Sequence, residues 1–204
     1  KSTIFEMLIQ ELKNRGIPED AIIKIKCNDP DYDNYTAKDM YTDLTKAISD
    51  KGRCYLFLDE LQEINGWEKT VNALLENFNV DVYVTGSNSK LMSSEISTYL
   101  TGRYVIIPVY TLSFREYMTF KNTDSSKARE AFDEYIQYGG FPIIGISSFD
   151  TRSAYQVVEG IYASVITRDI SKRHKIRNKE LFDRTVRYII ENTGKTFSAS
   201  SIVK

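Results

Sequence analysis

Two adjacent carboxylates, Asp59 and Glu60, directly follow an apolar run over residues 54–58. Such a run is typical of a strand buried on both faces of a parallel sheet, and open α/β sheets bind ligands at the carboxyl ends of their strands. Neighbouring carboxylates repel each other unless a cation or a substrate compensates their charge. Nucleotide hydrolysis uses this pair: Asp59 would hold Mg²⁺ through water, and Glu60 would orient or deprotonate the attacking water. The alternative is a strand that ends in two solvated loop acids.

A second set of residues suited to nucleotide chemistry stands at the start of the chain. Lys1 and Ser2 immediately precede an amphipathic helix, as do the last two residues of a phosphate-binding loop, G-x-x-x-x-G-K-[ST]. A phosphate would there meet the amino end of the helix. The Lys1 ammonium would contact the β and γ phosphates, the Ser2 hydroxyl would ligate Mg²⁺, and Thr3 would touch the α phosphate. The alternative is an ordinary helix start.

Polar residues further along the chain complete the candidate site. Asn88 is the first choice, and Ser87 the second, to hold the γ phosphate and the attacking water, although Gly, Ser and Asn also form ordinary turns. Arg103 stands at the start of the last predicted strand. It could reach a γ phosphate, in its own or a neighbouring subunit, as an arginine finger. The alternative for Arg103 is a surface arginine.

The elements that must position these residues follow a regular pattern. Apolar residues recur at helical spacing from residue 5 until Gly16 stops the helix. Strands and helices then alternate, which predicts right-handed crossovers and a parallel sheet. The predicted strands are residues 21–27, 54–58, 80–85 and 104–109, and the predicted helices between them begin near residues 36, 67 and 91.

The pattern changes to helices alone after this α/β part. One helical stretch runs from residue 114 to about 138 and another from 153 to about 168, with a break at residues 139–142 (GGFP). A last helix is predicted over residues 179–191.

Several separately spaced motifs resemble one family. They are the runs at residues 55–62 (YLFLDELQ), 66–68 (GWE), 85–89 (TGSNS), 100–104 (LTGRY) and 112–117 (LSFREY). In this order they resemble the prokaryotic AAA-type (AAA_14) ATPases of the kind that carries a C-terminal domain of unknown function 4143 (DUF4143). The resemblance covers nearly the whole chain.

The resemblance implies a P-loop NTPase of the AAA+ (ASCE) type, with helices on both faces of the parallel sheet. Residues 1–110 would form the nucleotide-binding core, residues 111–178 a helical lid, and residues 179–204 the beginning of a winged helix. The chain starts without methionine and stops inside a helical pattern, so we expect a fragment of a longer protein. The first strand and the phosphate-loop glycines would precede it, and a nuclease-like domain would follow.

The family's motifs carry over residue by residue. Asp59 and Glu60 correspond to its Walker B pair, and Lys1 with Ser2 to the end of its Walker A motif. Asn88 or Ser87 corresponds to its sensor. The run at residues 139–142 matches its lid motif, although a tight turn between two helices explains that run equally well.

Composition excludes several classes of protein. The chain has 27 Lys and Arg against 28 Asp and Glu and a net charge of −1, which excludes a globally basic nucleic-acid coat and an acidic tail. With 42% hydrophobic residues it can build a core. No apolar run approaches the length of about 20 residues that spans a bilayer, so we expect a cytoplasmic protein without a membrane span. Cys27 and Cys54 fit no metal spacing and are predicted to be buried and reduced.

The leading interpretation is a Mg²⁺-dependent ATPase, with ATP and Mg²⁺ as cofactors and a homo-oligomer as a candidate assembly. The sequence itself leaves GTP open. The stretch 168–187 holds eight basic against three acidic residues, so DNA is a candidate partner, although a solvated helix face also explains that charge. The alternative function is a nucleotide-regulated DNA-binding or interaction module with little turnover. A scaffold with a decayed site is a third, which the intact Asp59–Glu60 pair opposes.

Overall fold

The structure is a computed structural model that describes residues 1–48, 51–86, 100, 102–166, 170 and 176–196. The chain divides into two compact units, Lys1–Val109 and Tyr110–Lys204. Within the described residues, no helix has both the length and the apolar character needed to cross a membrane.

The first unit is built on a parallel sheet of three strands in the order β1-β2-β3. The strands are β1 (Ile22–Lys26), β2 (Cys54–Asp59) and β3 (Val80–Val84). Leu58 of β2 lies opposite Ile25 of β1 and Val84 of β3. The carboxyl ends of all three strands therefore meet at one edge, and the parallel sheet that the alternating pattern predicts is confirmed.

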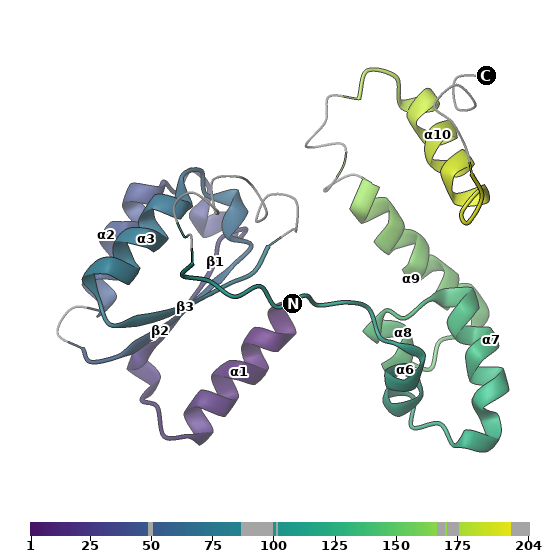
Figure 1. Cartoon of the computed structure of the whole chain (residues 1–204), viewed down its shortest axis with the longest axis horizontal. Coiled ribbons are helices and arrows are strands. Elements are labelled where there is room, and N and C mark those ends of the chain that lie inside the picture. The colour runs from purple at the N-terminus through teal and green to yellow at the C-terminus, as the bar shows by residue number, and fades with distance from the viewer. Residues whose placement is uncertain (49–50, 87–99, 101, 167–169, 171–175, 197–204) are drawn as a thin grey trace. The chain divides into compact units, whose positions relative to one another are not determined.

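Helices cover both faces of this sheet, as Figure 1 shows. Helix α1 (Ser2–Asn14) lies on one face, and α2 (Ala37–Ile48) and α3 (Trp67–Asn77) lie on the other. The larger apolar core fills the space under α2 and α3, where Met40, Leu44, Leu56, Leu58 and Leu74 are almost completely buried. Three 3₁₀ turns complete the connections: η1 (Glu19–Ala21), η2 (Pro30–Tyr32) and η3 (Leu61–Glu63).

The α1 face of the sheet is held by aromatic rings. Phe5 is the buried residue of α1, and its ring centroid lies 5.1 Å from that of Phe57 in an edge-to-face pair. The Phe57 ring stacks on Tyr83 of β3 at 4.7 Å. Aromatic pairs of this kind contribute about 0.5–1.5 kcal/mol beyond their buried area. They fix α1 against the two strands that carry the candidate site.

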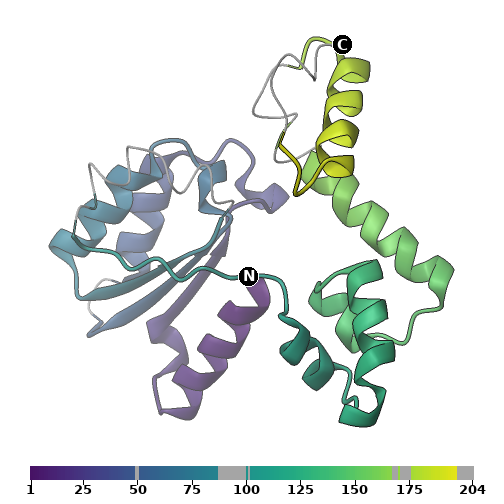
Figure 2. The same ribbon diagram turned by 45° about the vertical axis from the view of Figure 1, so that its right-hand side comes forward.

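The strand predicted at residues 104–109 does not form. These residues have no regular secondary structure and pair with no strand among the described residues, and Figure 2 draws them as a coil without an arrow. Val105 is 87% exposed and Ile107 is 79% exposed. An apolar run becomes a strand only where a neighbour supplies its backbone hydrogen bonds, and the prediction from the run alone was wrong. The helix predicted at 91–100 lies outside the described residues except for Leu100, which is buried.

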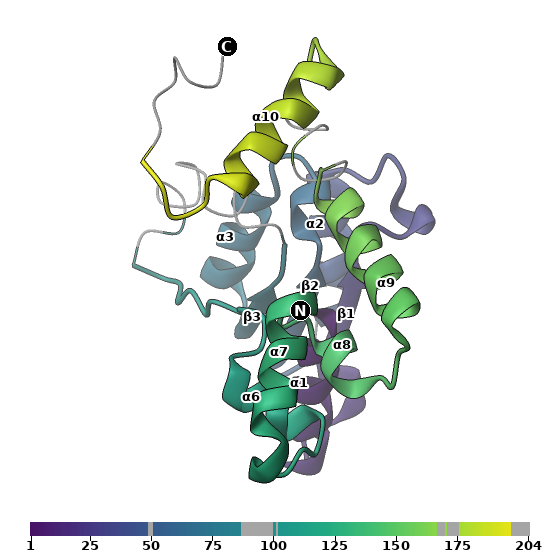
Figure 3. The ribbon, with the colours of Figure 1, turned by 90° about the vertical axis from the view of Figure 1, so that its right-hand side faces the viewer.

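The second unit is helical, as the sequence predicts. Its helices are α6 (Phe114–Phe120), α7 (Ala128–Tyr138), α8 (Pro142–Ile146), α9 (Thr151–Ser164) and α10 (Lys179–Glu191), with the 3₁₀ turn η4 (Ser125–Lys127) before α7. Figure 3 shows α6, α7 and α8 close together. Their small core is made by Leu112, Tyr117, Tyr138, Ile144 and Ala154. The lid and winged-helix roles expected for this unit remain predictions.

The GGFP run at residues 139–142 is a sharp turn between α7 and α8. Gly139 ends α7 with φ +80, a conformation that favours glycine. Gly140 accepts a hydrogen bond of 2.6 Å from Leu112 N–H, and a Cβ on Gly140 would lie 2.2 Å from the Leu112 carbonyl oxygen. Pro142 begins α8, where its missing N–H costs nothing. The run is thus explained by backbone geometry.

Candidate functional site

The candidate site lies at the carboxyl edge of the sheet, where β2 ends in Asp59. Leu56 and Leu58 belong to the core under α2 and α3, whereas Phe57 contacts α1. Because side chains alternate along a strand, Asp59 shares the α1 face with Phe57. Its side chain is 1% exposed. A carboxylate in such a place needs a fixed hydrogen-bond donor or a cation.

Thr85, the residue after β3, supplies that donor. Its hydroxyl donates a hydrogen bond to Oδ1 of Asp59 and accepts one of 3.2 Å from the backbone N–H of Glu60. The backbone of Thr85 adds two bonds: its N–H donates to Leu58 O at 3.0 Å and its carbonyl accepts from Leu61 N–H at 3.1 Å. The Thr85 side chain therefore contacts both acids, Asp59 through its carboxylate and Glu60 through its backbone N–H.

Glu60 stands at the turn from β2 into η3. Its backbone has φ 54 and ψ 40, in the left-handed region, and its side chain is half-buried. The amide Nε2 of Gln62 donates a hydrogen bond to the Glu60 carboxylate. Gln62 itself is 7% exposed. The Glu60 carboxylate thus remains partly open to solvent while an amide from the same turn holds it.

The start of α1 reaches this edge of the sheet. The ammonium of Lys1 donates a hydrogen bond of 2.6 Å to the carbonyl of Gly86, the residue that follows Thr85. Ser2 and Thr3 lie in the exposed first turn of α1. Free N–H groups and the helix dipole make such a turn favourable for anions. The structure therefore brings Lys1 to the carboxyl end of β3, next to Thr85, which contacts Asp59 and Glu60.

Cys27 directly follows β1 and lies next to the backbone of Asp59. Its backbone N–H donates to Asp59 O at 2.9 Å. Burial, together with the negative charges of Asp59, Glu60 and Glu63, raises the pKa of the Cys27 thiol to about 12. The thiol is therefore a neutral, buried neighbour of the site, and the prediction that both cysteines are buried and free is confirmed.

Arg103 is not brought to this site. Its guanidinium donates to Asn72 Oδ1 at 3.1 Å and to Glu76 Oε1 at 3.0 Å. The bond from Arg103 to Glu76, with a second one donated by the Asn72 amide, lowers the pKa of the Glu76 carboxyl. Both partners lie in the later turns of α3, which runs away from the carboxyl edge. Ser87 and Asn88, the predicted sensor residues, lie outside the described residues.

The residues present fit a magnesium ion held jointly with a nucleotide. Within the described ranges no group of three or more His, Cys, Asp or Glu could hold a metal ion. Mg²⁺ bound with a nucleotide needs less from the protein, because one or two side-chain oxygens act with phosphates and water. The buried carboxylate of Asp59 and the hydroxyl of Ser2 are hard oxygen donors of this kind.

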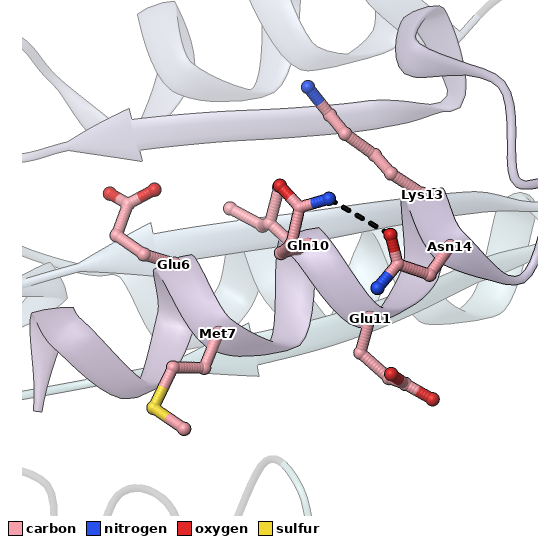
Figure 4. Close-up of a pocket in the computed structure, with 7 residues that line it drawn as sticks. Glu6, Met7, Gln10, Glu11, Lys13 and Asn14 are labelled. Carbon is pink, nitrogen blue, oxygen red and sulfur yellow. Dashed lines mark hydrogen bonds between the residues drawn. The ribbon is translucent and has the colours of Figure 1, made fainter.

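A shallow hollow elsewhere in the first unit belongs to α1 alone. Figure 4 shows the side chains that line it, with Gln10 donating a hydrogen bond of 3.0 Å to Asn14. All of its lining residues lie along one helix. It gathers no residues from the carboxyl edge and is separate from the candidate site.

Sequence reasoning missed the parts played by Thr85 and Gln62. Both stand in runs that the sequence singles out, Thr85 just before the predicted sensor and Gln62 just after the acids. The available signal was position, since Thr85 directly follows β3, the strand beside β2. The sequence does not show the pairing register of β2 and β3, and this register decides which polar side chain contacts Asp59.

A parallel sheet whose second strand leads into a buried and a half-buried acid, beside a Lys-Ser helix start, is typical of a nucleotide-binding α/β protein of the AAA type. A family described as an AAA domain matches residues 1–118, so the chain belongs to this family. A second family, described as a domain of unknown function (DUF8612), matches residues 129–204. It differs from the DUF4143 domain that the sequence resemblance names, which the comparisons do not show.

Two curated relatives are similar over most of the chain. An uncharacterized protein of Haemophilus influenzae is 31% identical over 206 residues, covering 99% of this chain and 51% of the relative. An uncharacterized protein of Methanocaldococcus jannaschii is 32% identical over 184 residues, covering 85% of this chain and 41% of the relative. The chain thus spans about half the length of these relatives or less. No solved structure matches it significantly.

Proposed function

We propose that this chain is the nucleotide-binding core of a Mg²⁺-dependent ATPase of the AAA+ superfamily, which couples ATP hydrolysis to a conformational change. The observation that carries the proposal is the pair of acids at the end of β2. Asp59 is buried and fixed by Thr85, whereas Glu60 is half-buried beside it. A fixed inner carboxylate and a more accessible outer one suit metal binding and water activation respectively.

Each residue of the site has a separate task in this proposal. Mg²⁺, when bound, would neutralise charge on the phosphates. Asp59 and the Ser2 hydroxyl would hold it, Lys1 would exchange its bond to the Gly86 carbonyl for the β and γ phosphates, and Thr3 would contact the α phosphate. Glu60 would orient a water and accept its proton.

The sensor and the arginine finger belong to the proposal as well. Asn88, or Ser87 in its place, would hold the γ phosphate, because both follow the strand end that carries Thr85. Since Arg103 is bound to α3, we propose that it acts on a neighbouring subunit of a homo-oligomer.

We further propose that a strand from outside the described residues completes the sheet. The outer edge of β3 pairs with no strand among the described residues. Large apolar side chains of the same unit are exposed as well, among them Met7 on α1, Val105 and Ile107. A strand beside β3 would satisfy that edge and cover apolar surface, as edges normally require. In the AAA+ fold, such a strand leads into the phosphate loop.

Residues 111–178 of the helical unit would form the lid. From residue 179 the chain would continue into a winged helix, followed by a DUF4143 domain. DNA binding with little turnover stays the alternative function. The basic side chains of Lys179, Arg184 and Arg187 are exposed on α10, together with the acidic side chains of Glu180, Asp183 and Glu191, so α10 by itself carries no excess of positive charge. DNA affinity that falls steeply with salt would support the alternative function.

Substitution of Glu60 tests the ATPase directly in the full-length protein. Glu60→Gln keeps the shape and removes the base, so it should retain Mg-ATP affinity by calorimetry and lose about 10²–10⁴-fold of turnover. Glu63→Gln is the matched control, because Glu63 is exposed three residues further on and should retain full turnover. Equal turnover of Glu60→Gln and the parent at saturating ATP would remove Glu60 from this role.

A further inference from the structure

Gln62 is a buried polar residue on a rigid turn beside the proposed catalytic acid. It is the central residue of η3 (Leu61–Glu63), and this turn is anchored in the core by Leu61 at 0% and Ile64 at 2% exposure. Its amide donates to the carboxylate of Glu60. A side chain that is 7% exposed has few rotamers open to it, so the position of this donor is fixed by packing.

Glu60 is held from three directions. Its N–H donates to Thr85 Oγ1 at 3.2 Å, its carbonyl accepts from Glu63 N–H at 3.1 Å, and its carboxylate accepts from Gln62. The left-handed backbone at φ 54 costs a residue other than glycine about 1–2 kcal/mol. Such a conformation persists where its surroundings determine it, and this often happens at functional sites.

We propose that Gln62 is a positioning residue that aims the Glu60 carboxylate at the attacking water. This inference rests on the proposed ATPase function. The side-chain amide of Gln62 is a donor that does not titrate. A general base must be correctly placed to accept the proton of the water, and the hydrogen bond from Gln62 serves this need.

Two substitutions of Gln62 test its positioning role in the full-length protein. Gln62→Met keeps the length of the side chain and removes the donor. It should lower kcat about 10-fold to 100-fold, the cost of a misplaced catalytic group, and leave the KM for ATP unchanged within about twofold. Gln62→Glu replaces the donor by a carboxylate that repels the Glu60 carboxylate. It should lower kcat at least as far as Gln62→Met, again with the KM for ATP unchanged within about twofold.

A merely structural role for Gln62 would not lower kcat alone in a protein that stays folded. An unchanged kcat in Gln62→Met overturns the inference. So does a rise of kcat in Gln62→Met, because Gln62 would then restrain Glu60 in an unproductive position. The fluorescence of Trp67, the single tryptophan, reports whether each variant is folded.

Nuclear magnetic resonance tests the contact without any turnover. With ¹⁵N-labelled protein, the side-chain amide signal missing from Gln62→Met belongs to Gln62. One of its protons should lie downfield in the parent and move upfield in Glu60→Ala. A signal that does not move overturns the inference whether or not the protein hydrolyses ATP. If the signal moves but the parent shows no turnover, the contact is real and both the ATPase proposal and the aiming role fail.

Discussion

Replacing Thr85 by valine removes one hydroxyl from the carboxyl edge of the sheet and leaves the shape of the side chain almost unchanged. That hydroxyl donates to Asp59 and accepts from Glu60 N–H. Asp59 is 1% exposed, so water does not readily replace the lost donor. A hydrogen bond to a charged group contributes about 1.5–3 kcal/mol, and a neutral one about 0.5–1.5 kcal/mol. Thr85→Val should therefore lower the free energy of unfolding by about 3 kcal/mol.

Thr70→Val is the matched control in the same unit. Thr70 is 6% exposed, and its hydroxyl donates a single neutral bond of 2.9 Å to the carbonyl of Ala37. Its loss should cost about 1 kcal/mol. The two variants lose the same atoms from sites of similar burial, so the difference of about 2 kcal/mol isolates the contribution of the acid pair.

Urea unfolding followed by the fluorescence of Trp67 measures this difference. Trp67 is 4% exposed and packs in the larger core of the first unit, so its signal follows the unit that contains both threonines. With a slope of about 1–3 kcal/mol/M, the midpoints of the two variants should differ by about 1 M. Equal midpoints would refute the reasoning, because the hydrogen bonds of the Thr85 hydroxyl would then contribute no more to stability than the single bond from Thr70 to a backbone carbonyl.

Two further predictions concern residues away from the acids. Gly140→Ala places a Cβ 2.2 Å from the Leu112 carbonyl oxygen, so it should destabilise the helical unit by about 1–3 kcal/mol. In contrast, Gly160→Ala meets open space and should raise the thermal midpoint seen by circular dichroism, because alanine favours a helix. If Arg103 serves a neighbouring subunit, inactive Arg103→Ala and Glu60→Gln proteins should regain activity when mixed. No recovery in proteins shown to associate would argue against a shared site.

The elements of the fold could be read from the sequence wherever a local pattern determines them. The apolar run that forms β2 (Cys54–Asp59) is buried whichever strand lies beside it, and the helix faces of α1 and α3 follow from apolar spacing. Residues 104–109 show the limit of this reasoning. Their apolar pattern resembles that of β2, but a strand also requires a neighbour with free backbone groups. No local pattern states whether that neighbour is present.

The site was predictable in outline for a related reason. Topology alone sends the end of β2 and the end of β3 to one edge, so Asp59 and Glu60 could be placed there from sequence. The partners that hold them depend on register and on one backbone conformation. Thr85 meets Asp59 because Leu58 pairs with Val84, and Gln62 reaches Glu60 because Glu60 turns with φ 54. Neither fact has a signature in residue type.

The unequal surroundings of the two acids support the division of labour proposed for them. Adjacent residues on a strand point to opposite faces, and a regular continuation of β2 would send Glu60 towards the core under α2 and α3. The left-handed turn at Glu60 prevents this and returns its carboxylate to partial exposure. Asp59, still within the strand, stays inside and bound to Thr85. An acid that cannot move suits a metal ion that needs fixed ligands, and an acid at the solvent boundary suits a water molecule that must enter and be consumed at every turnover.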